Sequence, residues 1–213
     1  MSKINLTYNE KEVIQQIDNL ESIAKDYLME IEEFSYLDLF FFSVVDKSLK
    51  LINPFLFSLR ERNVTVLAIL TRVQMDCALR TFATTLVDDS NELCKNMLVE
   101  GKQLNKIQDK NERYLTDKYL CEKMKEYLKE DVYDLYKKVC GFVHFSSDSF
   151  YSIVKDEGNS SFSMLVGRKN RQEDKKTYEQ RSVELANDFY FFGSLLIENF
   201  LPSWLKQKDE WNE

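Results

Sequence analysis

The sequence predicts an all-α protein, a multi-helix bundle formed by one domain over residues 1–213. Only 5 Gly and 2 Pro occur among 213 residues, and most of the chain shows apolar residues at helical spacing. Apolar residues make up 44% of the chain and aromatic residues 13%, which is ample for a sizeable core. One departure from the helical pattern, a hairpin and loop insertion at residues 146–176, is expected within this domain.

The first two helices are predicted from their apolar spacing and from the residues at their ends. Asn9 is placed to cap the first helix, and apolar residues then recur at every third or fourth position as far as Ile31. The second helix begins near Tyr36 and is expected to end by Asn53, because Pro54 cannot continue it without a break. The pair Asn53-Pro54 is then expected to open a short separate helix.

The third helix, at about residues 64–87, is expected to be central. Asn63 is placed to cap it, and its sequence, VTVLAILTRVQMDCALRTFATTLV, is apolar almost all round, which is typical of a buried helix. A fourth helix begins after Ser90 and carries apolar residues on one face as far as Ile107, with Gly101 weakening it. The sequence thus predicts one buried helix with others packed around it.

Two further helices precede the single break in the helical pattern. The polar stretch QDKNERYLT leads into an exposed helix at residues 117–129, and the next helix, at 131–145, either continues it or is separate. Residues 149–167 contain two short β-prone runs around the turn sequence DEGN, which predicts a β-hairpin. A long aromatic helix begins near Thr177, and Pro202 is expected to stop it.

The composition argues against several classes of protein. The four cysteines stand far apart and form no CxxC pair, so neither a metal site nor a cofactor is predicted. The polar N-terminus, MSKINLTYNEKE, does not resemble a secretory leader, and free thiols fit a reducing cytoplasm. No apolar run is long enough to cross a membrane, so no membrane partner is expected.

The charge balance bears on nucleic-acid binding. The net charge of −7 counts against a large nucleic-acid footprint, which normally needs a basic patch. One small basic cluster, GRKNRQEDKK at residues 167–176, is interpreted as a solvated loop or, alternatively, as a loop that contacts phosphate. The charge balance therefore gives little support to RNA as a partner, and RNA is a candidate only because of other features of the sequence.

Three charged residues on the third helix form the first candidate site. Arg72, Asp76 and Arg80 are spaced at i, i+4 and i+8, so they share one face of a helix that is otherwise apolar. Charges on such a helix are costly unless they are paired, and Asp76 can balance only one of the two arginines. The remaining guanidinium needs another carboxylate, backbone carbonyls or an anionic ligand. The stripe is therefore either an internal salt-bridge network or an anion site.

The second candidate is His144, the only histidine in the chain. It lies near the end of a helix, one turn after Cys140 and about two turns after Tyr136 and Lys137. A histidine at a helix end is well placed for acid–base chemistry. The alternative interpretation is that His144 packs against the helix end or caps it. Ser146, in the turn that follows, completes this group of candidate residues.

The segment YKKVCGFVHFSS, together with the Arg-bearing helix, resembles an uncharacterised bacterial all-helical family. Members of that family carry a Tyr-x-x-x-Ser/Cys-x-x-His-x-Ser segment, whose counterparts here are Tyr136, Cys140, His144 and Ser146, with one spacing residue shifted. The resemblance covers roughly residues 64–166 and rests on short motifs.

More distantly, the arrangement is similar to the HEPN superfamily. Its members are α-helical bundles, usually dimeric, and often metal-independent endoribonucleases of toxin–antitoxin and phage-defence systems. Their motif, Arg-x4–6-His, maps its histidine onto His144 and its arginine onto Lys138 or Lys137. The resemblance implies that His144 transfers protons, while Arg72, Arg80 or Lys137 stabilises the charge that develops on the phosphorane. Lysine departs from the family pattern, because it cannot grip a phosphate as a planar guanidinium does.

Two functions follow from these residues. The first is a HEPN-like ribonuclease or effector that acts as a homodimer, with binding residues Asp76, Tyr136, Lys137, Lys138 and Ser146. The second is a non-catalytic all-α binding or assembly module, in which the charged cluster is structural or holds a small anionic ligand.

Overall fold

The protein is a helical bundle with one small β-hairpin, which confirms the predicted fold class. The computed structural model describes residues 11, 14–15, 18–22, 24–26, 33–129, 131–144, 154–164 and 175–204. The helices are α2 (Tyr36–Arg60), α3 (Val64–Ala83), α4 (Ser90–Leu98), α5 (Asp117–Leu128), α6 (Val132–Val143) and α8 (Lys175–Leu195), with short 3-10 turns at Thr84–Leu86 and Leu104–Lys106 and a π-helical turn at Leu196–Phe200. The strands are β1 (Val154–Gly158) and β2 (Ser161–Met164).

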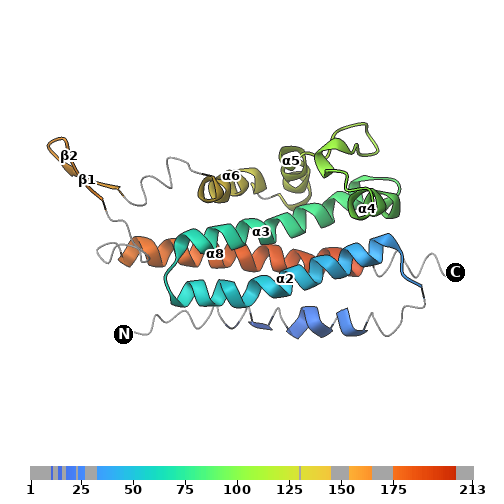
Figure 1. Ribbon diagram of the computed structural model, residues 1–213, viewed down its shortest axis with the longest axis horizontal. Coiled ribbons are helices and arrows are strands. Elements are labelled where there is room, and N and C mark those ends of the chain that lie inside the picture. The colour runs from blue at the N-terminus through green and yellow to red at the C-terminus, as the bar shows by residue number, and fades with distance from the viewer. Residues whose placement is uncertain are drawn as a thin grey trace.

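Helix α3 is the centre of the bundle, as its apolar sequence predicts. It packs against α2 and α8 along its length, and α5 and α6 contact it from the other side. Figure 1 shows α2, α3 and α8 side by side, with α5 and α6 above them and the N-terminal helical residues below. The side chains of Leu67, Met75 and Leu79 are fully buried, and Asn63 caps the helix by accepting from the N–H of Val66.

The first predicted helix is only partly described. Helical residues occur among positions 11–26, and Leu20 is fully buried there. The predicted cap, Asn9, lies outside the described residues.

The prediction that Pro54 separates two helices was wrong. Helix α2 is continuous from Tyr36 to Arg60, with Pro54 inside it. Buried residues continue in phase on both sides of the proline, from Ile52 to Phe55 and Leu59. Pro54 itself is exposed, so the carbonyl that loses its N–H partner lies on the solvent side. Burial of this continuous apolar face outweighs the local cost of the proline.

The prediction that Pro202 stops the last helix was also wrong. Helical residues continue from 201 to 204, after the π-helical turn Leu196–Phe200. In regular α geometry the Pro202 ring would press against the carbonyl of Glu198. The wider π-helical turn contains Glu198 and ends two residues before Pro202. The extension carries Trp204 to the start of α2, where its ring stacks on Phe41 with centroids 4.6 Å apart. Its Nε1 donates to Oδ1 of the fully buried Asp38 at 3.0 Å.

The segment between α4 and α5 is an ordered loop, where the sequence predicted a longer helix. Helix α4 ends at Leu98, and Gly101 has φ of +64°, which an α-helix cannot contain. Further on, the buried carboxylate of Asp109 accepts hydrogen bonds from the N–H groups of Asn111 and Arg113 and from the hydroxyl of Tyr119. This carboxylate therefore organises the polar stretch before α5.

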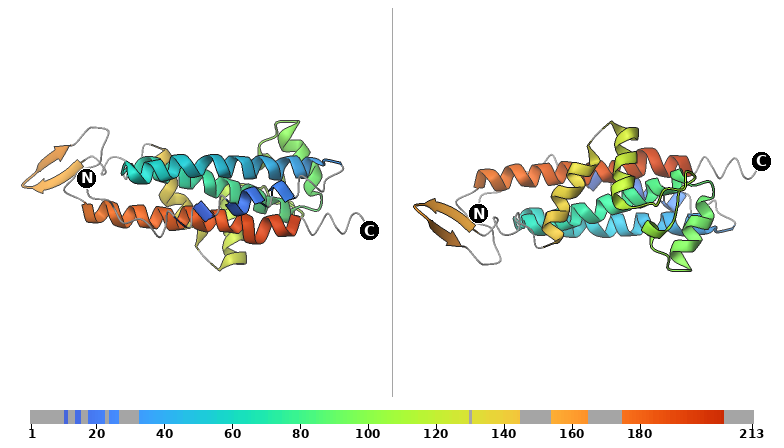
Figure 2. Two further views of the ribbon diagram at one scale, coloured as in Figure 1. Left: turned by 90° about the horizontal axis from the view of Figure 1, so that it is seen from below. Right: turned by 90° about the horizontal axis from the view of Figure 1, so that it is seen from above.

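Helices α5 and α6 are separate, which answers the question that the sequence left open. Lys129 has a left-handed backbone with φ of 64° directly after α5, and this conformation ends the helix. Asp131 then caps α6 by accepting from the N–H of Asp134. The two helices run across α3 and α8 as a helical hairpin (Figure 2, right).

The predicted β-hairpin is present at residues 154–164. Its strands are antiparallel, and Asn159 and Ser160 both have positive φ, as the two central residues of a type I′ turn do. The hairpin extends beyond the end of the helical bundle (Figure 1). Ser146 and most of the basic cluster at residues 167–176 lie outside the described residues.

Within the described residues, no helix combines the length and the apolar composition that a membrane span requires.

We predict that Trp204→Phe lowers the free energy of unfolding by about 1–3 kcal/mol, because buried Asp38 loses the indole donor. Urea denaturation measures this change. The control is Lys50→Ala, which removes an exposed ion pair with Asp46 and should change stability by less than about 0.5 kcal/mol. Equal effects of the two substitutions would contradict a structural role for the indole contact.

Candidate functional site

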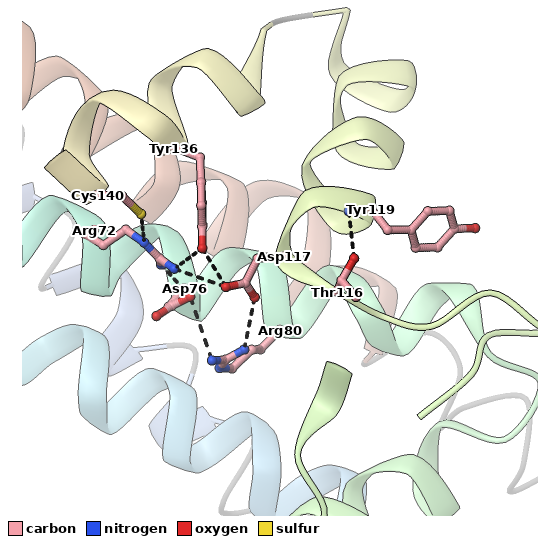
Figure 3. Close-up of polar contacts among 8 residues, drawn as sticks. All are labelled: Arg72, Asp76, Arg80, Thr116, Asp117, Tyr119, Tyr136 and Cys140. Atoms are coloured by element: carbon pink, nitrogen blue, oxygen red, sulfur yellow. Dashed lines mark hydrogen bonds and ion pairs between the residues drawn. The ribbon is translucent and has the colours of Figure 1, made fainter. Parts of the chain in front are cut away.

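Helices α3, α5 and α6 bring six polar side chains together where they meet (Figure 3). The stripe on α3 supplies three of them, as its i, i+4, i+8 spacing predicts. The first residue of α5 and two residues one turn apart on α6 supply the others. We call this group the Arg72 cluster: Arg72, Asp76, Arg80, Asp117, Tyr136 and Cys140.

All three nitrogen atoms of the Arg72 guanidinium contact groups within the cluster. Nε donates to Sγ of Cys140 at 3.1 Å, and Nη2 donates to the hydroxyl of Tyr136 at 2.9 Å. Nη1 lies 2.5 Å from Oδ1 of Asp76, although neither atom has a well-aligned hydrogen bond, so the contact is an ion pair. The guanidinium also lies over the Tyr136 ring, 4.2 Å from its centroid. Since only 10% of the side chain is exposed, Arg72 is committed to internal contacts.

Asp117 is the carboxylate that balances the second arginine. Its Oδ2 accepts the hydroxyl of Tyr136 at 2.6 Å and lies 3.4 Å from Nη2 of Arg72. Its Oδ1 lies 4.0 Å from Arg80, which is also 3.9 Å from Asp76. Two arginines and two aspartates thus form a neutral group. Sequence reasoning left the partner of the excess guanidinium open and did not identify Asp117, because only packing brings α5 against α3.

Electrostatics fix the protonation of the cluster. Burial lowers the pKa of Arg72, but the ion pair with the adjacent carboxylate of Asp76 outweighs it, and the net result is a pKa above the ordinary value. Burial, together with the hydrogen bond to Asp117, raises the pKa of Tyr136 well above its ordinary value. At neutral pH Arg72 is therefore a cation and Tyr136 a neutral donor.

His144 lies beyond one end of the cluster. It is exposed and forms the C-cap of α6, with its backbone N–H donating to the carbonyl of Cys140 at 3.0 Å. Tyr136 on α6 contacts Asp117 and Nη2 of Arg72, whereas Cys140, one turn later, contacts Nε of Arg72. The direction from Tyr136 to Cys140 along α6 therefore leads away from Arg80. The histidine is a further turn along, about 6 Å at 1.5 Å per residue. No hydrogen bond or ion pair joins it to either arginine.

The two lysines that occupy the HEPN arginine positions point to other partners. Lys137 pairs with Asp134 at 2.5 Å on the same helix. Lys138 pairs with Glu184 of α8 at 2.7 Å. The structure therefore brings together Arg72, Asp76, Arg80 and Tyr136 of the predicted site residues, but not the two lysines. Ser146 lies outside the described residues.

The cysteines are free thiols, and three of the four are buried. Burial raises the pKa of Cys77 to about 11 and that of Cys94 and Cys121 to about 12. These thiols therefore stay protonated near neutral pH, whereas a cysteine binds a metal ion as the thiolate. In the part of the chain that the structure describes, no three His, Cys, Asp or Glu side chains are grouped to hold a metal ion.

Comparison with known proteins finds no matching family model, no similar curated sequence and no similar solved structure. The contacts of the Arg72 cluster and the position of His144 are therefore the basis for a functional proposal.

We predict that Arg72→Ala lowers the free energy of unfolding by about 3 kcal/mol, because Asp76 and Asp117 would keep only a distant, half-exposed cation. Chemical denaturation measures the change. The control is Arg80→Ala on the same helix face, which should cost less than about 1 kcal/mol since its ion pairs are long and exposed. If Arg72→Ala cost no more than Arg80→Ala, the cluster would not be what holds these helices together.

Proposed function

We propose that this protein is a non-catalytic all-α binding or assembly module, in which the Arg72 cluster is structural. The observation that carries the proposal is the complete internal use of the Arg72 guanidinium. Its Nε, Nη1 and Nη2 atoms contact Cys140, Asp76 and Tyr136. To bind a phosphate, Arg72 would have to leave these partners and expose two carboxylates to each other.

The ligand class that fits best is a small anion at Arg80. Its side chain is 40% exposed, and its distances of 3.9 and 4.0 Å to Asp76 and Asp117 are longer than a hydrogen bond. The guanidinium fork therefore keeps N–H groups that can bind a phosphate or carboxylate. The nearby aspartates and the net charge of −7 favour a small anion over a nucleic acid.

A second candidate is a HEPN-like ribonuclease or toxin or phage-defence effector of a bacterial cytoplasm. Its specific support is the exposure of His144, since a general acid or base must reach substrate. Here His144 would exchange protons with the 2′-hydroxyl or the leaving oxygen of RNA. Neither Arg72 nor Arg80 forms a hydrogen bond or ion pair with His144, so another cation would have to complete the site, and in a homodimer a second protomer would supply it.

An RNA cleavage assay in EDTA separates the two candidates. We expect the wild-type protein and His144→Ala to leave RNA intact on a denaturing gel, and neither to slow growth when expressed. Lys50→Ala, which removes an exposed charge on α2 that belongs to neither candidate site, serves as the control. Cleavage by the wild type and by Lys50→Ala, lost in His144→Ala, would overturn the non-catalytic proposal and support the ribonuclease.

A thermal shift assay with inorganic phosphate tests the anion site. Phosphate should raise the melting temperature of the wild type but not that of Arg80→Ala, because a ligand stabilises only the state that binds it. Sodium chloride at the same ionic strength is the control for general salt effects. Equal shifts in the wild type and Arg80→Ala would exclude Arg80 as the anion-binding residue.

A further inference from the structure

The hairpin of β1 and β2 extends beyond the end of the helical bundle, and one of its faces is apolar and exposed (Figure 1; Figure 2). Phe162 and Met164, two residues apart on β2, share that face, and their exposed fractions are 67% and 60%. Val154 of β1 is the register partner of Met164 and lies on the same face. On the opposite face the hydroxyl of Ser163 donates to the carboxylate of Glu157 at 2.6 Å. The hairpin is therefore amphipathic, with its apolar face toward solvent.

The hairpin also lacks the strands that usually stabilise such a unit. In the described residues the sheet consists of β1 and β2 alone. A two-stranded hairpin is marginally stable in water, and further strands that extend its apolar face stabilise it. This sheet therefore has an outer edge on each strand at which another strand can add.

The two outer edges differ in charge. The strand β1, with the sequence VKDEG, contains three charged residues in succession, and charges on an edge strand oppose pairing with a further strand. The strand β2, with the sequence SFSM, contains no charged residue and no proline. Its outer edge therefore offers backbone N–H and C=O groups without the features that normally protect an edge.

The sequence of β2 is complementary to a second copy of itself. In an antiparallel pair centred on Ser163, the two Ser163 residues lie opposite each other, and Phe162 of each copy lies opposite Met164 of the other. This register places the apolar faces of both hairpins on the same side of the sheet, and it brings a thioether against an aromatic ring twice. A shift by one residue would put the two apolar faces on opposite sides.

Charge and position favour the same occupant. Each chain carries a net charge of −7, so two copies repel each other wherever acidic surfaces meet, but the two β2 strands bring no like charges together. Since β2 runs from the hairpin turn back toward the bundle, antiparallel pairing places the two bundles at opposite ends of the joined sheet (Figure 1). The helices of the two copies therefore do not obstruct the contact.

We propose that β2 is the contact surface for a second copy of this chain, and that two hairpins join through their β2 strands into a four-stranded antiparallel sheet. The strand order is β1, β2, β2, β1, and a two-fold axis passes through the Ser163 pair. Such a contact uses the same surface on both copies, so it closes at a dimer. The inference goes beyond the proposed function, because the hairpin contributes no residue to the Arg72 cluster.

Sedimentation equilibrium of the full chain over a range of concentrations tests the dimer. A contact between two four-residue strands is smaller than a stable interface, so we expect a weak dimer with a Kd on the order of 100 μM. Phe162→Lys should raise this Kd about tenfold, because the lost cross-strand contact occurs twice. The matched control is Val99→Lys, which replaces a similarly exposed apolar side chain (62%) at the end of α4 and should leave the Kd unchanged.

Two outcomes of this experiment overturn the proposal. One is a wild-type chain that stays monomeric at concentrations well above the expected Kd. The other is a Val99→Lys variant that weakens association as much as Phe162→Lys does, since association would then not depend on the hairpin.

Disulfide cross-linking tests the register of the two strands. Because the two Ser163 residues lie opposite each other in the dimer, Ser163→Cys treated with oxidised glutathione should form a covalent dimer on a non-reducing gel. Ser203→Cys, which changes an exposed serine after the π-helical turn, is the matched control and should form no more covalent dimer than the wild type, whose own thiols are free. Equal cross-linking of the two variants, or none by Ser163→Cys, would contradict pairing through β2.

Discussion

The buried guanidinium of Arg72 is the constraint on which the arrangement of the shorter helices depends. An arginine on a central apolar helix is tolerated only when its charge and its N–H groups are satisfied. Here the satisfaction comes from both helices of the α5–α6 hairpin, through Asp117, Tyr136 and Cys140. The hairpin cannot slide along α3 without taking Asp117, Tyr136 and Cys140 away from the buried guanidinium of Arg72, so the contact sets its register.

The same constraint decides what the site can do. A catalytic arginine needs free N–H groups that reach a substrate, whereas those of Arg72 end on protein atoms. Arg80 retains free donors because its ion pairs are long, and His144 is exposed but lies past the opposite end of the cluster. In sequence, Arg72, Arg80 and His144 resemble a nuclease site. In the structure Arg72 is enclosed by internal contacts, Arg80 keeps N–H groups that can bind an anion, and His144 is separate from both.

Tertiary packing also overrode two local signals, both of them prolines. Pro54 and Pro202 each mark a helix boundary in the sequence, yet both lie within continuing helix. In α2 the apolar face on either side of Pro54 packs on one core. After α8 the added turn brings Trp204 onto Asp38, which ties the C-terminal end of the described chain to the start of α2. The cost of about 3 kcal/mol for a proline inside a helix is smaller than the free energy gained by burying these apolar side chains.

The sequence by itself determined the all-α class, the central helix with its Asn63 cap, the i, i+4, i+8 stripe and the β-hairpin. These features follow from periodicity and capping, which act over one or two helix turns. Only the tertiary structure decided that Asp117, 45 residues from Arg72, balances its charge, and that Lys138 binds Glu184 rather than a site beside His144. Such pairings depend on which helix faces pack together, and that is set by the whole core rather than by any local pattern.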